Sequence, residues 1–191
     1  METLRSKSVA ALLLGCTLLG CASTSLTSYR DPAFADTRFG KVAVLATGVQ
    51  LDDRIALENR MVGALRNKRV TAEAVIRLVP PTRSIGDDEL SAALLADGYD
   101  AILTVQRVEA GSKIEPSWSQ MLGGSSANAT AEHLYASFDA SLIDLRTRQV
   151  AWMASARTGG SEYAGVSNLI DSFADNTADA LENKQLLAQR P

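Results

Sequence analysis

Chemistry that enzyme sites usually need is scarce in this 191-residue chain. It holds one histidine, His133, and two cysteines, Cys16 and Cys21. The patterns G-x-S-x-G, G-x-G-x-x-G and H-E-x-x-H, and the P-loop pattern, do not occur in it. These absences argue against the corresponding hydrolase, dinucleotide-binding, nucleotidase and zinc-protease classes. They predict a protein that is not an enzyme, with no catalytic residue, no cofactor and no metal site.

Basic stretches are also lacking, and the formal net charge of the chain is −3. Without a stripe of lysine and arginine, little counterion release would drive binding to nucleic acid. Polybasic attraction to anionic lipid is missing for the same reason. The composition therefore predicts no nucleic-acid partner and favours no anionic lipid surface.

The first 21 residues combine a basic start at Arg5 and Lys7 with an apolar run over Val9–Leu19, closed by Leu18–Cys21. This arrangement resembles the signal peptide of bacterial lipoproteins. In that class the leader is cut before a cysteine that carries a diacylglyceryl thioether and is then usually N-acylated. The resemblance implies a signal peptide over residues 1–20, lipidation of Cys21 by fatty acids such as palmitate, and attachment to a membrane through this lipid.

Three other interpretations of this segment are disfavoured. A cut before Cys16 would leave an apolar core of only Val9–Leu14, which is shorter than the usual core of roughly 7–15 residues. A membrane-spanning helix needs about 20 apolar residues, and the serines and threonines after Cys21 end the run too early. A buried amphipathic helix would show a polar face, which Val9–Leu19 lacks.

Processing at Cys21 has two further consequences. Cys16 leaves with the leader and Cys21 becomes a thioether, so the mature chain is expected to have no free thiol and no internal disulfide. Ala22 follows the cysteine in place of the aspartate that favours inner-membrane retention in enterobacterial-type lipoproteins. That resemblance implies a periplasm-facing domain on the outer membrane, and the inner membrane remains open.

Residues 21–40 are predicted to form the lipidated cysteine and a flexible tether. The segment from Ala22 to Phe39 is rich in serine and threonine and shows no sustained hydrophobic period. Its eighteen residues would reach roughly 60 Å when extended.

Residues 41–185 are predicted to form one globular α/β domain, followed by a C-terminal tail over 186–191. Its first half alternates strands and helices, which predicts parallel pairing with right-handed crossovers. The expected order is a strand over Lys41–Thr47, a helix with Leu57, Met61, Ala64 and Leu65 on one face, a strand over Val70–Val79, a helix from Asp87 to Gly98 and a strand over Tyr99–Val108.

The second half of the domain has a different pattern. Apolar and polar residues alternate over His133–Leu142 and again over Val150–Ala156, which predicts an antiparallel hairpin. A last helix from about Glu162 carries an apolar stripe at Val166, Leu169, Ile170, Phe173, Thr177 and Leu181. The predicted fold is a mixed α/β sheet with a parallel βαβαβ first half, an antiparallel hairpin and a C-terminal helix that covers the sheet.

Short segments in this order resemble a group of bacterial envelope lipoproteins, much of it uncharacterised. The group comprises the amino-terminal domain of TolB, the penicillin-binding-protein activator lipoproteins and the globular part of the curli secretion lipoprotein. The resemblance is carried by the lipoprotein signal, Tyr29–Pro32, Lys41–Leu45, Gly98–Leu103 and Ile143–Trp152. It implies a scaffold or accessory role and supplies no catalytic residues.

The residues that could carry chemistry have simpler explanations. His133 lies on the polar side of its strand, where a solvated or locally hydrogen-bonded side chain is expected. The pairs Asp52-Asp53 and Asp87-Asp88 stand where helices begin, which predicts a capping role. Ser125 and Ser126 lie in a glycine-rich segment without a base at a recognisable spacing.

The connection over Gly111–Thr130 contains three apolar residues, Trp118, Met121 and Leu122, among glycine, serine and asparagine. If exposed, they would form a contact surface for a protein partner or lipid. The alternative is that Trp118 and Leu122 fold back over the edge of the sheet. Trp152, in contrast, belongs to the apolar face of a strand and is expected in the core.

These observations predict a membrane-anchored periplasmic lipoprotein that binds another envelope component without catalysis. Anchoring would raise its effective concentration toward partners near the membrane. The alternative is a periplasmic small-ligand-binding protein or a hydrolase that uses His133.

Overall fold

The structure is a computed structural model that describes residues 22–83, 85–116, 130–161 and 164–189. Cys21, Trp118, Met121, Leu122, Ser125 and Ser126 lie outside these ranges. The elements in chain order are β1 (Ala22–Arg30), a 3-10 helix (Pro32–Phe34), β2 (Lys41–Thr47), α1 (Leu51–Asn67), β3 (Thr71–Ala74), α2 (Val75–Leu78), α3 (Asp87–Ala96), β4 (Ala101–Pro116), β5 (Thr130–Asp144), β6 (Val150–Gly160) and α5 (Val166–Asn183).

The strands form one six-stranded sheet with the order β1-β6-β5-β4-β2-β3. β2 pairs in parallel with β3 and β4, whereas β4, β5, β6 and β1 pair antiparallel. The predicted mixed α/β class, with a parallel first half, an antiparallel hairpin and a C-terminal helix, is confirmed. None of the helices in the described ranges is long and apolar enough to cross a membrane.

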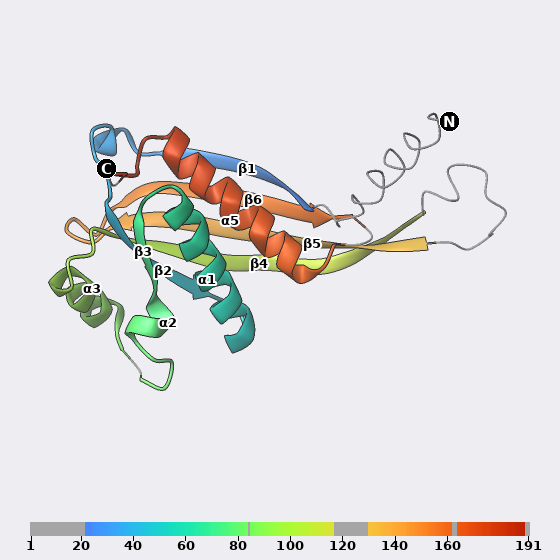
Figure 1. The fold of residues 1–191 in the computed structure, drawn as a ribbon, viewed down its shortest axis with the longest axis horizontal. Helices are drawn as coiled ribbons and strands as arrows, with labels where there is room; N and C mark the ends of the chain where they lie inside the picture. Colours follow the sequence, from blue (N-terminus) through green and yellow to red (C-terminus); the bar gives the residue numbers. More distant parts are fainter. Residues whose placement is uncertain (1–21, 84, 117–129, 162–163, 190–191) are drawn as a thin grey trace, which may run out of the picture.

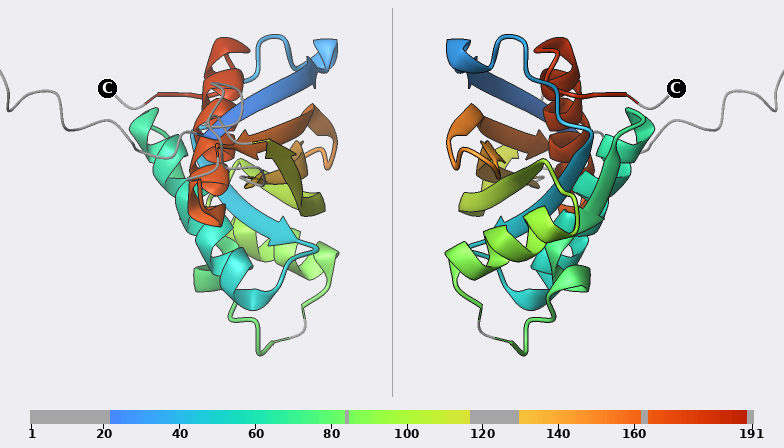
Figure 2. Two further views of the ribbon diagram at one scale, coloured as in Figure 1. Left: turned by 90° about the vertical axis from the view of Figure 1, so that its right-hand side faces the viewer. Right: turned by 90° about the vertical axis from the view of Figure 1, so that its left-hand side faces the viewer.

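Helices cover the two faces of the sheet unequally (Figures 1 and 2). α1 and α5 lie side by side on the inner face and enclose the main core, in which Phe173 stacks on Phe138 with ring centroids 4.3 Å apart. Trp152 is 1% exposed in this core, as its place in the alternating pattern predicted. On the outer face, α3 buries Leu90 and Leu94 against β2 and β4.

The predicted tether is wrong over Ala22–Arg30. This segment is β1, which pairs with β6 along its whole length, from Ala22 opposite Gly160 to Arg30 opposite Trp152. Its inward side chains are those of Ala22, Thr24, Leu26, Ser28 and Arg30, and the strand packs against α5, where Thr24 hydrogen-bonds to Ser172. The globular fold therefore begins immediately after Cys21.

The predicted C-terminal tail is wrong at its start. Leu186 is fully buried, and Leu187 forms an isolated parallel bridge with Phe39. These two leucines fill the end of the core below β2. The folded unit therefore extends beyond the predicted limits of 41–185 in both directions.

Two predicted elements have different limits. The strand predicted over Val70–Val79 ends at Ala74, and the chain turns into α2, where Ile76 donates its backbone N–H to the buried carboxylate of Glu58 at 2.8 Å. The connection between β4 and β5 was predicted to begin at Gly111. The residues from Gly111 to Pro116 instead continue β4, and Pro116 lies opposite Thr130 of β5.

Candidate functional site

The inner face of the sheet contains an apolar pocket of about 390 Å³ between α1, α5 and the β4–β5 hairpin. Leu57 of α1, Phe138 of β5, and Leu169 and Ile170 of α5 supply its hydrophobic walls. We call it the α1–α5 pocket. Its volume lies within the range of roughly 300–1,000 Å³ that small-molecule sites occupy.

Small side chains create this space. Ala110 of β4 lies opposite Ala136 of β5 on the inner face, and both line the pocket. The next inward-facing residue of β5 is Phe138, and Arg107 of β4 lies opposite it. A β-bulge falls between Arg107 and Glu109. Val108 is the extra residue of this bulge and has no partner on β5. The alternation between the two faces is therefore shifted by one residue, and both Arg107 and Ala110 face the helices.

One ion pair polarises the wall of the pocket. Nη1 of Arg107 lies 2.6 Å from Oδ2 of Asp53, and the two side chains are about one third exposed. Asp53 lies in the first turn of α1, where the helix dipole favours a negative charge. The pocket thus offers a hydrophobic interior with a paired cation and anion at its side, an arrangement suited to binding an apolar group.

The predicted roles of the acidic pairs need a correction. The N-caps of α1 and α3 are Gln50 and Gly86, and neither makes a side-chain capping hydrogen bond. Asp52, Asp53, Asp87 and Asp88 lie one to three residues further along, within the first turns. They therefore stabilise the helices through the dipole, and Asp53 and Asp88 form ion pairs with Arg107 and Arg148.

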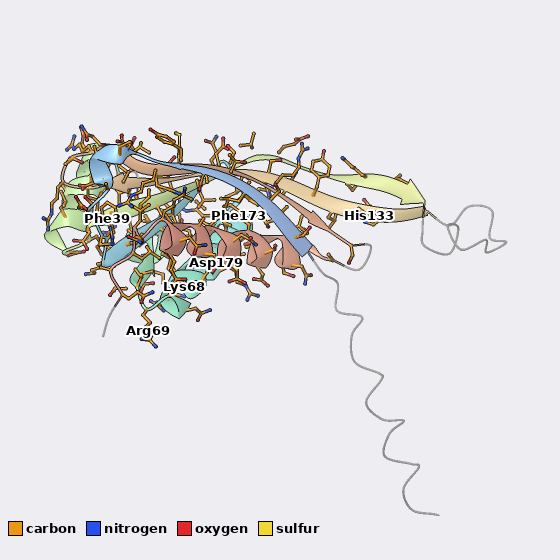
Figure 3. The ribbon with its side chains drawn as sticks, turned by 90° about the horizontal axis from the view of Figure 1, so that it is seen from above. Phe39, Lys68, Arg69, His133, Phe173 and Asp179 are labelled. Carbon is orange, nitrogen blue, oxygen red and sulfur yellow. The ribbon has the colours of Figure 1, made fainter. Side chains whose placement is uncertain are left out.

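His133 lies on β5 toward the end of the sheet where the β4–β5 hairpin projects (Figure 3), and its side chain is on the outer face, opposite the face that carries the α1–α5 pocket. Its Nδ1 is 3.2 Å from the carbonyl oxygen of Gly160. This is the local hydrogen bond that its position on the polar side of the strand predicted. Within the described ranges, no group of three or more histidine, cysteine, aspartate or glutamate residues could hold a metal ion.

The predicted lipidation site at Cys21 and the predicted contact residues Trp118, Met121 and Leu122 lie outside the described residues, so both remain predictions. The α1–α5 pocket was missed by sequence reasoning. Arg107 and Asp53 are 54 positions apart, and the signal that could have indicated the site was the interruption of alternation around Val108.

Comparisons with known proteins show likeness in structure only. No protein-family model and no curated protein matches the chain. PelC from Paraburkholderia phytofirmans, solved as a dodecamer, superposes with a TM-score of 0.54 at 15% identity, over 87% of this chain and 99% of that one. A dodecameric single-residue variant of PelC gives 0.52 at 15% identity, over 88% and 99%.

A lipoprotein, GNA1162 from Neisseria meningitidis, gives a TM-score of 0.47 at 13% identity, over 75% of this chain and 99% of that one. The PelC likeness extends over nearly all of both chains. The fold of this chain is therefore one that occurs in bacterial PelC.

Proposed function

We propose that this chain is a lipoprotein held by a lipid on Cys21, with a periplasm-facing domain that binds another envelope protein without catalysis. The α1–α5 pocket carries this proposal. It is apolar, its two charged groups are paired with each other, and its size suits one or two hydrophobic side chains of a partner. A partner segment with an exposed leucine or aromatic residue is the occupant that this chemistry favours.

The proposed anchor is consistent with the start of the fold. Because β1 pairs from Ala22 onward, the lipid would hold the domain close to the membrane surface. The outer membrane is the proposed location. We also propose that the chain is similar to the group formed by TolB, the penicillin-binding-protein activator lipoproteins and the curli secretion lipoprotein. These are envelope accessory proteins, which agrees with the proposed role.

Self-assembly is a second candidate. PelC was solved as a dodecamer. In the described part of this chain, β1 has a strand neighbour on one side only, and its other edge is nine residues long. The opposite edge, β3, has four residues, and Arg66 donates to the carbonyl of Ala72 there at 2.9 Å. The edge of β1 is thus the one at which a second copy could add a strand.

The anchor is tested by metabolic labelling with radioactive palmitate. Wild type and Cys16→Ala should incorporate the label and fractionate with the outer membrane, whereas Cys21→Ala should not be labelled. Labelling lost in Cys16→Ala and kept in Cys21→Ala would reject the assignment of the anchor.

Partner binding is tested with a photo-crosslinking amino acid placed at Ala110, which lines the pocket, in intact cells. One envelope protein should be captured, and its capture should be lost when Leu169→Trp fills the pocket. Val108→Trp serves as the matched control, because Val108 is exposed on the same strand and does not line the pocket. Equal capture in all variants would reject the pocket as the binding site.

Two outcomes would support other candidates. A small molecule bound to the purified protein and displaced by Leu169→Trp would identify a small-ligand-binding protein instead. Crosslinks between copies through β1, with a defined oligomer by native mass spectrometry, would support the assembly candidate.

A further inference from the structure

The outer face of the sheet is hollowed where β1 begins. A cavity of about 470 Å³ lies there, and the side chains that line it include Ser23, Ser25, Lys113, His133, Tyr135 and Arg157. Gly159 of β6, which lies opposite Ser23, also lines it and adds no side chain there. We call it the outer hollow.

Three nitrogen-bearing side chains from three strands line the outer hollow. Lys113 of β4 lies directly opposite His133 of β5, and Arg157 of β6 lies opposite Ser137, four residues further along β5 on the same face. The Lys113 ammonium lies 5.7 Å from the centre of the Tyr135 ring, which keeps it over the hollow.

Among the described side chains, the carboxylate of Glu109 contacts this group. Glu109 lies 3.9 Å from Arg157 and accepts a hydrogen bond from the Tyr135 hydroxyl at 3.1 Å. The Glu109 carboxylate offsets the charge of Arg157, and Lys113 is the second cation that lines the hollow. His133 donates from Nδ1 to the Gly160 carbonyl, because a carbonyl oxygen only accepts.

The outer hollow adjoins the proposed lipid anchor. Ser23 lies opposite Gly159, and Ala22 lies opposite Gly160, so the hollow begins two residues after Cys21. Two extended residues span roughly 7 Å. Figure 1 shows that the β4–β5 hairpin projects beyond the ends of β1 and β6 at this same end of the sheet.

We infer that the outer hollow binds the phosphate of an anionic phospholipid headgroup in the leaflet that holds the anchor. The inference rests on the proposed lipidation of Cys21, since the anchor brings this end of the sheet to the bilayer surface. Lysine, arginine and serine hydroxyl donors suit phosphate oxygens, and Gly159 leaves room for the group. The headgroup contact would fix how the domain is oriented on the membrane.

The test uses the full lipidated protein in vesicles of phosphatidylcholine alone and of phosphatidylcholine mixed with phosphatidylglycerol in equal amounts. Hydrogen–deuterium exchange reports on residues 132–136 and 157–160. In wild type, phosphatidylglycerol should slow exchange in both segments. Lys113→Gln with Arg157→Gln should raise the phosphatidylglycerol fraction needed for half of this effect by a factor of roughly five per cation removed.

The matched control removes the same charge at the opposite end of the sheet. Arg146→Gln with Arg148→Gln, in the β5–β6 turn, should leave the lipid-dependent protection unchanged. Circular dichroism and thermal melting of each variant identify any that fails to fold. In that event the charge-preserving Lys113→Arg variant, which should keep the protection, provides the comparison with wild type.

The outcomes separate the inference from the proposal on which it rests. Vesicle-bound wild type without phosphatidylglycerol-dependent protection would overturn the headgroup site and leave the anchor intact. Wild type that carries no lipid and stays off vesicles would overturn the anchor and, with it, the inference. Equal protection by inorganic phosphate in detergent micelles would overturn the commitment to a lipid headgroup.

Discussion

The hydroxyl oxygens of Thr24 and Thr158 lie 2.8 Å apart between β1 and β6. Thr24 Oγ1 also lies 2.8 Å from the hydroxyl of Ser172 on α5. Thr158 is fully buried, so its hydroxyl depends on a protein partner. This small network joins the first strand of the fold to the last helix, and it makes β1 a structural part of the domain.

Replacing Thr24 should test this role. Thr24→Val should lower the free energy of unfolding by about 1–3 kcal/mol, measured by urea denaturation, because the buried hydroxyl of Thr158 loses its partner. The double variant Thr24→Val/Thr158→Val should recover much of that loss, since the buried hydroxyl of Thr158 is then removed together with its partner. Strictly additive losses would show that the two hydroxyls are not coupled.

A second buried polar group should be more costly to alter. Glu58 of α1 has no exposed surface, and its carboxylate accepts backbone N–H groups from Ala46 at 3.1 Å and Ile76 at 2.8 Å, and Nε of Arg54 at 2.8 Å. Glu58→Gln keeps the shape but turns an amide NH₂ toward a donor. It should destabilise the protein by roughly 3 kcal/mol in urea denaturation.

Arg54→Met is the comparison for Glu58. It removes the cation but leaves both backbone hydrogen bonds, and the Arg54 side chain is 23% exposed, so water can replace it in part. A smaller loss than for Glu58→Gln is expected. A larger one would mean that the ion pair, and not the backbone contacts, holds the carboxylate.

The sequence was sufficient where a strand or helix has one continuous apolar face. β2, α1, α5 and the alternating parts of β5 and β6 were predicted for this reason. β1 was missed because its inward residues include Thr24, Ser28 and Arg30, so no hydrophobic period marks it. A hydroxyl network can fill an edge of a core, and composition alone does not distinguish it from a polar linker.

The two cavities could not be predicted, because each depends on the register between distant strands. Lys113, His133 and Arg157 are separated by about twenty residues or more and converge only through the pairing of β4, β5 and β6. Charge counts therefore showed no basic stripe. The absence of such a stripe argued against an anionic lipid surface, while the fold gathers three nitrogen-bearing side chains at one end of the outer face.

Close packing at the end of β6 leads to a third prediction. A Cβ at Gly160 would lie 2.5 Å from Cβ of Ala164 and 3.1 Å from Leu169. Gly160→Ala should therefore cost about 1–3 kcal/mol in urea denaturation through overpacking. Adding Ala164→Gly should relieve most of this loss. No rescue by the second substitution would indicate that the backbone of Gly160, and not the contact, causes the effect.

Two ion-pair sites join α1 and α5 and should differ in strength. Lys68 Nζ contacts Asp179 at 2.6 Å and Glu182 at 2.7 Å, whereas Arg60 contacts Asp171 at 3.0 Å, and the Arg60 side chain is 57% exposed against 25% for Lys68. Hydrogen bonds to Asp179 and Glu182 raise the pKa of Lys68 above its ordinary value. Lys68→Met should cost about 1 kcal/mol and Arg60→Met less, as measured by thermal unfolding. The reverse order would contradict this assignment.

The hydroxyl of Tyr135 should titrate late because of Glu109. The hydrogen bond to the Glu109 carboxylate, and then its charge, raise the pKa of Tyr135 above the ordinary 10.0. Between the ordinary and the raised value, the folded protein holds a proton that the unfolded chain has lost. The contribution of this hydrogen bond to the stability of the fold is therefore complete below about pH 10 and is lost as the pH rises through the folded-state pKa.

Ultraviolet titration, with the signal of Tyr135→Phe subtracted, measures the midpoint of Tyr135 ionisation. This midpoint should be lower in Glu109→Gln than in wild type. Asp139→Asn, whose carboxylate binds Ser155 instead, should leave the midpoint unchanged, and an equal shift in both variants would reject Glu109 as the cause.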